Sequence, residues 1–455
     1  MSARSRIPAA LVLATLTAVS AAPVARASWT VPITITGDAG TSAVRAAGAA
    51  GGREAFAWIV TTKHVVRTSS QRGPASYLRA RARLPHGRVG TAQSVSSTRG
   101  IVTGAQIGLD AAGDAIAVWV QAGAHLSIMG AYRPHGKRFG KPFELGRSTH
   151  FDDARPVLAV GPSGDAAVAW NQGGHVQVVR RNGPASCPPS KARGCFSQPV
   201  SLRSGSDQTV AIGPLGSAYV AWAAGVHGAG MTDTQLRMVV VRRSAKRSTD
   251  HAISGGGDAS RPALAVRPNG TAILAWRASL PAGGEQDEPA AIMAATSSPD
   301  AVTTAPQTVT AGAATSPMLA LDTQGEAILA WSAFDATPGQ GDGPQVLSAV
   351  APAGSAAFGA PAAITPGGFV AENPSLAVDG AGTAYVVYDG GPAEATTPGG
   401  RGAFSNLRPA DGTFGAAIPL PAQLAVAPAV LAAGAQVSAL GFDAGGRPRV
   451  SDWTP

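Results

Sequence analysis

Residues Pro262–Trp276 read PALAVRPNGTAILAW, and this stretch decides the fold because the chain repeats it. Close copies are PVLAVGPSGDAAVAW at Pro156–Trp170, PMLALDTQGEAILAW at Pro317–Trp331 and PSLAVDGAGTAYVVY at Pro374–Tyr388. Looser copies end at Trp58, Trp119 and Trp222. A segment that recurs along the chain in this way is typical of an array of supersecondary units, so we interpret the chain as an array before considering any single site.

Each copy contains two apolar runs joined by a turn rich in Gly, Pro, Asn and Asp, which indicates a β-hairpin. A second motif follows the first. Residues Ile128–Leu145, IMGAYRPHGKRFGKPFEL, predict a strand, a turn and a last strand that contains Pro142. Proline suits an outer edge, where its missing N–H breaks no ladder hydrogen bond. Four antiparallel strands per repeat are the unit of a β-propeller blade.

Seven hairpin copies end in Trp or Tyr, and a degenerate eighth hairpin covers Ala429–Phe442, with a third strand expected at Arg447–Trp453. The strand missing from this last repeat matches Trp29–Ile35, near the other end of the chain. We therefore predict an all-β fold over residues 28–455, a single propeller of eight four-stranded blades closed by the N-terminal strand. Seven blades is the alternative if Ala429–Trp453 forms no sheet of its own.

The first 27 residues have the features of a secretory signal peptide: Arg4 and Arg6, the apolar run Leu11–Ala22, and the small-x-small sequence at Ala25–Ala27. A membrane anchor is the alternative, but the run is short for a bilayer span. We expect cleavage after Ala27 and a secreted protein. Loss of three arginines lowers the formal net charge from +9 to +6. The run Pro421–Leu440 is too broken for a confident span, and we predict no membrane span in the mature chain.

The two cysteines, Cys187 and Cys195, lie close together in CPPSKARGC. In an exported chain this pair predicts a disulfide that closes one loop. Two thiols with no histidine nearby make a poor zinc site.

The hairpin turns are short and uniform, whereas the loops after each Trp and between blades vary, so we expect a binding site on the face with the variable loops. The candidate residues there are His150, Asp152, Asp153, Arg155, Asp233, Arg261, Glu285, Asp287, Asp335, Glu372, Asn373 and Asp389. Their acids suit a cation or a polyhydroxylated ligand. Solubilising charge on loops is the alternative interpretation.

Basic residues gather instead on the third strands and the turns after them: Arg79, Arg81, Arg83, Arg133, Lys137, Arg138, Arg180, Arg181, Arg242, Arg243, Lys246 and Arg247. This distribution predicts an acidic face and a basic periphery. The basic residues suit contact with an anionic polymer, or they protect outer strands against aggregation. We predict no nucleic-acid binding, because no stacking aromatics accompany them.

The sequence carries no metal-binding histidine spacing, nucleophile elbow, P-loop or calcium loop, so no metal, cofactor or catalytic residue is assigned. The aromatic residue that ends each repeat is interpreted as packing between blades. We expect a monomer.

The pattern P-x-L-A-V-x-x-x-G-x-A-x-x-A-W followed by F-G-x-P resembles secreted bacterial β-propeller proteins with sialidase-like repeats. The chain departs from true sialidases, since its Asp110–Trp119 and Asp322–Trp331 spacings do not match an Asp-box. The leading hypothesis is a non-enzymatic binding or scaffold protein that engages a glycan, a cell-envelope component or a protein through one face. The alternative is a sialidase-like glycoside hydrolase or lyase.

Overall fold

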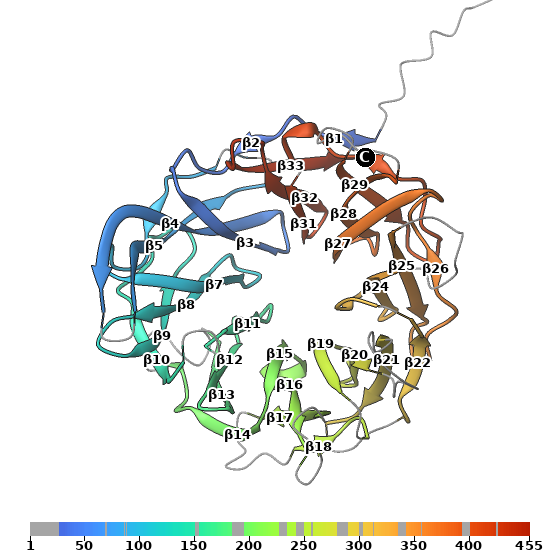
Figure 1. The fold of residues 1–455 in the computed structure, drawn as a ribbon, viewed down its shortest axis with the longest axis horizontal. Coiled ribbons are helices and arrows are strands. Elements are labelled where there is room, and N and C mark those ends of the chain that lie inside the picture. Colours follow the sequence, from blue (N-terminus) through green and yellow to red (C-terminus); the bar gives the residue numbers. More distant parts are fainter. Residues whose placement is uncertain are drawn as a thin grey trace, which may run out of the picture.

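The structure is a computed structural model, and it describes residues 27–68, 71–85, 87, 89–150, 154–183, 195–226, 234–242, 250–255, 258–279, 290–299, 304–312, 314–334, 343–355, 357–393, 401–424 and 426–455. The described chain forms eight antiparallel sheets arranged as blades around a ring (Figure 1). This confirms the predicted all-β propeller.

The first four blades follow one another along the chain. Blade 1 contains β3 (Thr41–Ala49), β4 (Arg53–Arg67), β5 (Arg72–Arg83) and β6 (Gln93–Ser94). Blade 2 contains β7 (Ile101–Leu109), β8 (Ala115–Ala122), β9 (Leu126–Arg133) and β10 (Phe143–Ser148). Blade 3 contains β11 (Val157–Val160), β12 (Ala166–Gln172), β13 (His175–Arg181) and β14 (Val200–Ser204). Blade 4 contains β15 (Ser206–Ile212), the 3-10 turn η3 (Pro214–Gly216), β16 (Ala218–Gly225), β17 (Thr234–Val241) and β18 (His251–Ala252).

The other four blades complete the ring. Blade 5 contains β19 (Ala259–Val266), β20 (Ala272–Ser279), β21 (Ala290–Ser297) and β22 (Gln307–Thr310). Blade 6 contains β23 (Met318–Leu321), β24 (Ala327–Phe334), β25 (Pro344–Ala351) and β26 (Ala362–Ala363). Blade 7 contains β27 (Phe369–Val378), β28 (Ala384–Pro392), β29 (Gly402–Arg408) and β30 (Ile418–Pro419). Blade 8 contains η4 (Ala422–Leu424), β31 (Val426–Ala433), β32 (Gln436–Phe442), β33 (Pro448–Thr454), β1 (Ser28–Trp29) and β2 (Ile33–Thr34).

The first strand of each blade lies nearest the ring axis and the fourth lies outermost (Figure 1). Because neighbouring strands are antiparallel, the turns between strands one and two share a face with those between strands three and four. We call this the turn face. The opposite face, the loop face, receives the loops between strands two and three and the connections between blades.

Both ends of the described chain meet in blade 8. Strands β1 and β2 pair with β33, so Trp29 lies opposite Trp453 and Ile33 opposite Val450. The Trp29 and Trp453 rings pack edge to face, with centroids 5.3 Å apart. This confirms the predicted closure by the N-terminal strand and selects eight blades over seven. Such closure replaces open end interfaces with hydrogen-bonded strands.

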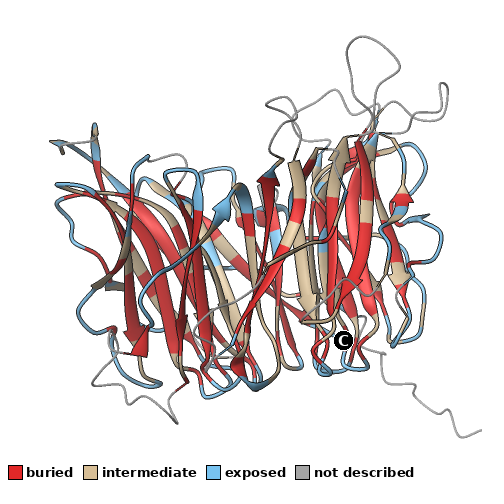
Figure 2. Cartoon of the chain, turned by 90° about the horizontal axis from the view of Figure 1, so that it is seen from below, coloured by how far each residue is buried: buried red, intermediate tan, exposed pale blue. Residues whose placement is uncertain are grey.

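The hydrophobic core is divided among the blade interfaces. Each of eight buried clusters joins two neighbouring blades, including the last and the first. The aromatic side chains that end the repeats are all buried, at most 1% exposed: Trp58, Trp119, Trp170, Trp222, Trp276, Trp331 and Tyr388. Buried residues occupy the middle of the blades between the two faces (Figure 2). The packing role predicted for these aromatic residues is confirmed.

The F-G-x-P motif also joins blades. The Gln93 side chain of blade 1 accepts a hydrogen bond from the Phe139 N–H (2.8 Å) and donates to the Phe139 carbonyl (2.9 Å) in blade 2. Gln307 and Phe358 repeat both bonds between blades 5 and 6. Within the described residues, the structure contains no helix long and apolar enough to cross a membrane.

Candidate functional site

Six of the predicted loop-face residues lie within the described chain. His150, Arg155, Arg261 and Asn373 are exposed, whereas Glu372 and Asp389 are half-buried. The other six lie outside the described residues: Asp152, Asp153, Asp233, Glu285, Asp287 and Asp335. The predicted acidic character of this face therefore stays a prediction.

Three polar residues near the start of first strands hold a strained backbone. Asp207, Arg261 and Asn373 have φ of 51°, 49° and 53°, and each lies at a register shift between the first two strands of its blade. Side chains other than glycine rarely adopt this left-handed conformation. Ala43 and Gly104 adopt the same conformation at the equivalent register shifts of blades 1 and 2, so the bulge is a feature of the repeat.

Hydrogen bonds link these bulges from blade to blade. Gln208 Nε2 donates to the Arg155 carbonyl (2.7 Å), and the Arg261 N–H donates to Asp207 Oδ2 (3.2 Å). Arg261 Nη1 then donates to Ser316 Oγ (2.9 Å). Asn373 Nδ2 donates to Asp389 Oδ2 (3.3 Å) within blade 7. The structure thus brings Arg155 and Arg261 into one linked rim, and Glu372, Asn373 and Asp389 into a second group.

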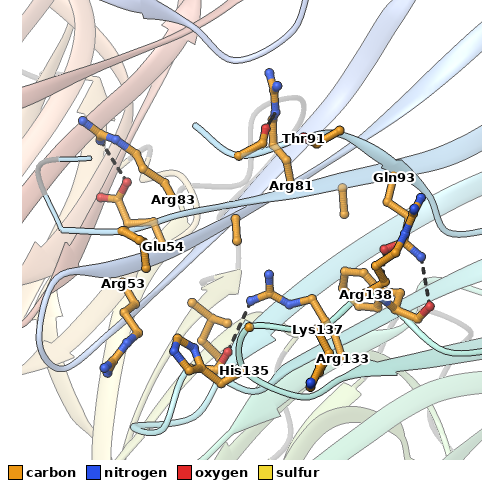
Figure 3. A pocket seen from close by; sticks show the side chains of 18 of the residues that line it. Arg53, Glu54, Arg81, Arg83, Thr91, Gln93, Arg133, His135, Lys137 and Arg138 are labelled. Atoms are coloured by element: carbon orange, nitrogen blue, oxygen red, sulfur yellow. Dashed lines mark hydrogen bonds and ion pairs between the residues drawn. The ribbon is translucent and has the colours of Figure 1, made fainter. Parts of the chain in front are cut away.

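A cavity of about 550 Å³ lies on the other face, the turn face, between blades 1 and 2. Its volume is in the range of small-molecule sites. Its walls are the β4 start, the β5 end with the following loop, and the two turns of blade 2 around Gly113 and Gly136. The titratable residues that line it are Arg53, Glu54, Arg81, Arg83, His135, Lys137, Arg138 and Arg133, the last of which reaches between the two blades (Figure 3). We call this cavity the basic pocket.

The one carboxylate in the lining of the basic pocket is already engaged. Glu54 is 1% exposed and forms an ion pair with Arg83 at 3.0 Å. Its other oxygen accepts from Ser438 and from Gln436 (3.2 Å) of blade 8. Burial raises the pKa of Glu54 despite these bonds and the charge of Arg83.

Most cations of the basic pocket have no acidic partner. Among the described residues, no carboxylate lies at ion-pair distance from Arg53, Arg81, Arg133, Lys137 or Arg138. Arg81 Nε donates to the Gly90 carbonyl (2.7 Å), and Arg53 Nη1 donates weakly to the Ala111 carbonyl (3.4 Å). The pocket is therefore positive, and an anion would supply its missing charge.

Arg133 occupies a position that other blades also fill with arginine. In four blades the third strand ends in arginine: Arg83 in blade 1, Arg133 in blade 2, Arg181 in blade 3 and Arg408 in blade 7. Each pairs with the second-strand residue that lies four positions before the repeat-ending aromatic residue. The other three are buried and reach back to the preceding blade. Arg83 binds Asp452, Arg408 binds Glu326 (2.6 Å) and Arg181 lies 4.5 Å from the Tyr132 ring.

The partner positions are changed in front of Arg133. Ala82 directly precedes Arg83 in blade 1, as Tyr132 directly precedes Arg133 in blade 2, so Ala82 and Tyr132 occupy equivalent positions. Arg53 stands where Glu326 stands in blade 6, five residues before the aromatic. Arg133 therefore meets the small side chain of Ala82 where Arg181 meets the Tyr132 ring. It meets the positive charge of Arg53 where Arg408 meets the carboxylate of Glu326. The cavity lies where blade 1 offers Arg133 neither an aromatic ring nor a carboxylate.

Sequence reasoning identified the basic third strands and turns but placed no binding site there. It missed Arg53 and Ala82 altogether. Aligning the repeats on their final aromatic would have shown Arg53 where other copies carry Asp114, Asp165 or Glu326. The cavity itself depends on two blades meeting, which no single repeat encodes.

Two further predictions concern cysteine and metal chemistry. Cys195 is buried, whereas Cys187 lies outside the described residues, so the disulfide stays a prediction. Among the residues that the structure describes, no group of three or more His, Cys, Asp or Glu side chains is placed to hold a metal ion.

No protein-family model matches the sequence, and no curated protein does. Solved structures do resemble the fold of this chain. A lectin from Burkholderia pseudomallei matches with a TM-score of 0.46 at 10% identity, over 83% of this chain and 98% of its own. A polysaccharide lyase matches with 0.45 at 8% identity, over 75% and 87%. A microbial sialidase matches with 0.37 at 9% identity, over 92% and 68%. Such low identities and TM-scores carry no inference about ligand or activity.

Proposed function

We propose that this protein is a non-enzymatic binding propeller that holds an extracellular glycan, a cell-envelope component or a protein in the basic pocket of its turn face. The observation that carries the proposal is the open cavity between blades 1 and 2. Five of its cations have no described carboxylate at ion-pair distance: Arg53, Arg81, Arg133, Lys137 and Arg138. Buried or half-buried charges without partners are costly, so a site that keeps them is suited to a ligand that completes them.

Binding is favoured over hydrolysis by the same lining. A glycoside hydrolase needs two carboxylates roughly 5–10 Å apart, one of them able to donate a proton to the leaving group. The lining contains only Glu54, and its oxygens are occupied by Arg83, Ser438 and Gln436. A hydrolase or lyase site on the loop face is the alternative.

The test combines binding with turnover. The full chain without residues 1–27 is screened against immobilised acidic and neutral glycans, and each hit is incubated with the protein to measure new reducing ends and unsaturated uronyl products. We expect binding without turnover. Ala82→Tyr, which fills the pocket, should abolish that binding.

A second pocket-filling variant and a control accompany Ala82→Tyr. Thr91→Trp narrows the pocket from an exposed wall position and should also weaken binding. Arg99→Ala removes a charge from an exposed position on the loop face and should leave binding unchanged. Retained binding by folded Ala82→Tyr and Thr91→Trp, a blank screen, or clear turnover of a glycan would each overturn the proposal.

We also propose that residues 1–27 direct export. Edman sequencing or mass spectrometry of protein recovered outside the cells should give Ser28 as the first residue. An intact N-terminus on membrane-bound material would instead indicate an anchor.

A further inference from the structure

We propose that the basic pocket recognises an acidic polysaccharide, and that Arg133 is the residue that binds its carboxylate or sulfate group, with Arg53 and Arg138 as flanking cations. This inference rests on the proposed function and specifies its ligand. The neighbours of Arg133 in the two blades support it.

The Arg133 side chain has donors to spare. A guanidinium carries five N–H donors. Arg133 Nη2 donates to the Gly113 carbonyl at 3.2 Å, and its buried Nε has no partner. The carboxylate of Asp114, on the same hairpin, is engaged by the Tyr132 hydroxyl and the His135 N–H (2.7 Å). Among the described residues, the Arg133 guanidinium therefore has no carboxylate at ion-pair distance, and several of its donors are left for a ligand.

The Arg133 guanidinium lies over an aromatic ring. Its carbon lies 5.8 Å from the centre of the Phe139 ring, and Phe139 is fixed in turn by Gln93. This distance is within cation–π range, and a guanidinium carries its donors in a rigid planar fork. This geometry suits two oxygens in one plane, as in a carboxylate or two oxygens of a sulfate ester.

Two features favour a saccharide over a nucleic acid. Binding of single-stranded nucleic acid relies on exposed aromatic rings for base stacking. The one aromatic residue in the lining, Phe139, is 8% exposed and carries Arg133 on its face. The remaining wall alternates small apolar groups such as Ala80 with polar groups such as Thr91 and Gln93, a surface suited to sugar rings and hydroxyls.

The cations extend beyond Arg133 along the turn face. Lys137 and Arg138 are exposed on the turn that follows β9, and Arg53 lies on the opposite, blade 1 side of the lining (Figure 3). Charges spaced along a groove favour a ligand that carries anions at intervals, because each added contact adds to the attraction. A chain of acidic sugars has this character, whereas a single small anion engages only one end.

The probes are polygalacturonate for carboxylates, dextran sulfate for sulfates, dextran as the neutral chain, and inorganic sulfate and phosphate as free anions. Dissociation constants are measured by biolayer interferometry at two salt concentrations. We expect wild type to bind at least one anionic polymer roughly tenfold or more tightly than dextran, with binding weakened by salt. The stronger of the two polymers identifies the anion.

The variants test the assignment of the anion to Arg133. Arg133→Met should weaken binding of the preferred polymer roughly tenfold, and Arg133→Lys should recover only part of it, because an ammonium is not a planar fork. Arg53→Glu, which places a carboxylate opposite Arg133, should weaken binding more than Arg133→Met. The matched control, Arg99→Glu, makes the same charge change on the loop face and should alter binding less than about twofold.

The results separate the two proposals. If dextran binds as well as the polyanions and Ala82→Tyr abolishes both, the pocket is a binding site but the anionic specificity is wrong. If polyanion binding is insensitive to Arg133→Met and Arg53→Glu in folded protein, the assignment to Arg133 is wrong. If Ala82→Tyr has no effect on any ligand, both proposals fail. Equal competition by inorganic sulfate or phosphate at low concentration overturns the polymer as ligand.

Discussion

Two arginines in equivalent positions, Arg83 at the seam between blades 8 and 1 and Arg133 between blades 1 and 2, have opposite surroundings. Arg83 is 5% exposed and donates to Asp452 Oδ1 (2.7 Å) and Glu54 Oε2 (3.0 Å). Burial opposes its charge, but the hydrogen bonds and charges of both acids outweigh burial and raise its pKa. Burial lowers the pKa of Arg133, and Asp114 offsets only part of that effect.

The difference shows that one residue type at one strand position has two uses. Where the preceding blade supplies a carboxylate, the arginine joins blades and is not accessible to a ligand. Where it supplies Ala82 and Arg53, a cavity remains and the arginine is left facing it. The ring can tolerate one such interface because hydrophobic contacts, including Phe139 and Trp119, still join blades 1 and 2.

The largest expected effect comes from removing the seam arginine. Arg83→Met leaves Glu54 and Asp452 buried and unpaired, which should destabilise the fold by about 3–5 kcal/mol. Denaturant unfolding measures it. Arg133→Met is the matched variant, and it should change stability by less than about 1 kcal/mol, because no carboxylate loses its partner. Equal destabilisation by the two variants would remove the distinction between them.

A second prediction concerns the ion pair of Asp38 with Arg79, a residue on the same strand as Arg81 and Arg83. Burial raises the pKa of Asp38, but hydrogen bonds from Thr36 and Trp58 and the charge of Arg79 outweigh it, so the pKa lies below its ordinary value. Arg79 Nη1 lies 2.6 Å from Asp38 Oδ1. Asp38→Asn should therefore destabilise the protein by about 1–3 kcal/mol near neutral pH.

The pH dependence of this effect has a definite sign. A carboxyl whose pKa is depressed by folding stabilises the folded state above its unfolded pKa, near 3.8 for aspartate, and loses that contribution as the pH falls through the folded value. The stability difference between wild type and Asp38→Asn should thus be constant above about pH 5 and shrink in more acidic solution. A difference that grows on acidification would contradict this account.

The smallest expected effects come from giving Arg133 the partners that its equivalents have. Arg53→Glu imitates Glu326 and Ala82→Tyr imitates Tyr132, and each should stabilise the protein by about 0.5–1 kcal/mol. Thermal unfolding of the two variants beside Arg99→Glu measures the gain. Loss of stability in both variants would show that other contacts already stabilise Arg133 and that a partner from blade 1 adds nothing.

The sequence predicted the strands better than it predicted the site. Hairpin periodicity located the repeats, and the match of Trp29–Ile35 to the fourth-strand motif predicted the closure that pairs Ser28 with Thr454. The variable loops directed attention to the loop face, where Arg155 and Arg261 do join through Gln208 and Asp207. Arg53 was overlooked because its role depends on a neighbour 80 residues away in the chain, Arg133, which one repeat cannot reveal.

The chain's own pattern thus determined the blade, the number of copies and the buried aromatic residue, because each is a local consequence of apolar spacing and turn residues that recurs in every repeat. The tertiary structure alone decided which arginines join blades and which one faces a cavity. An arginine's environment is set by the side chains that the preceding blade brings opposite it, and ring packing brings Asp452 to Arg83 but Ala82 and Arg53 to Arg133.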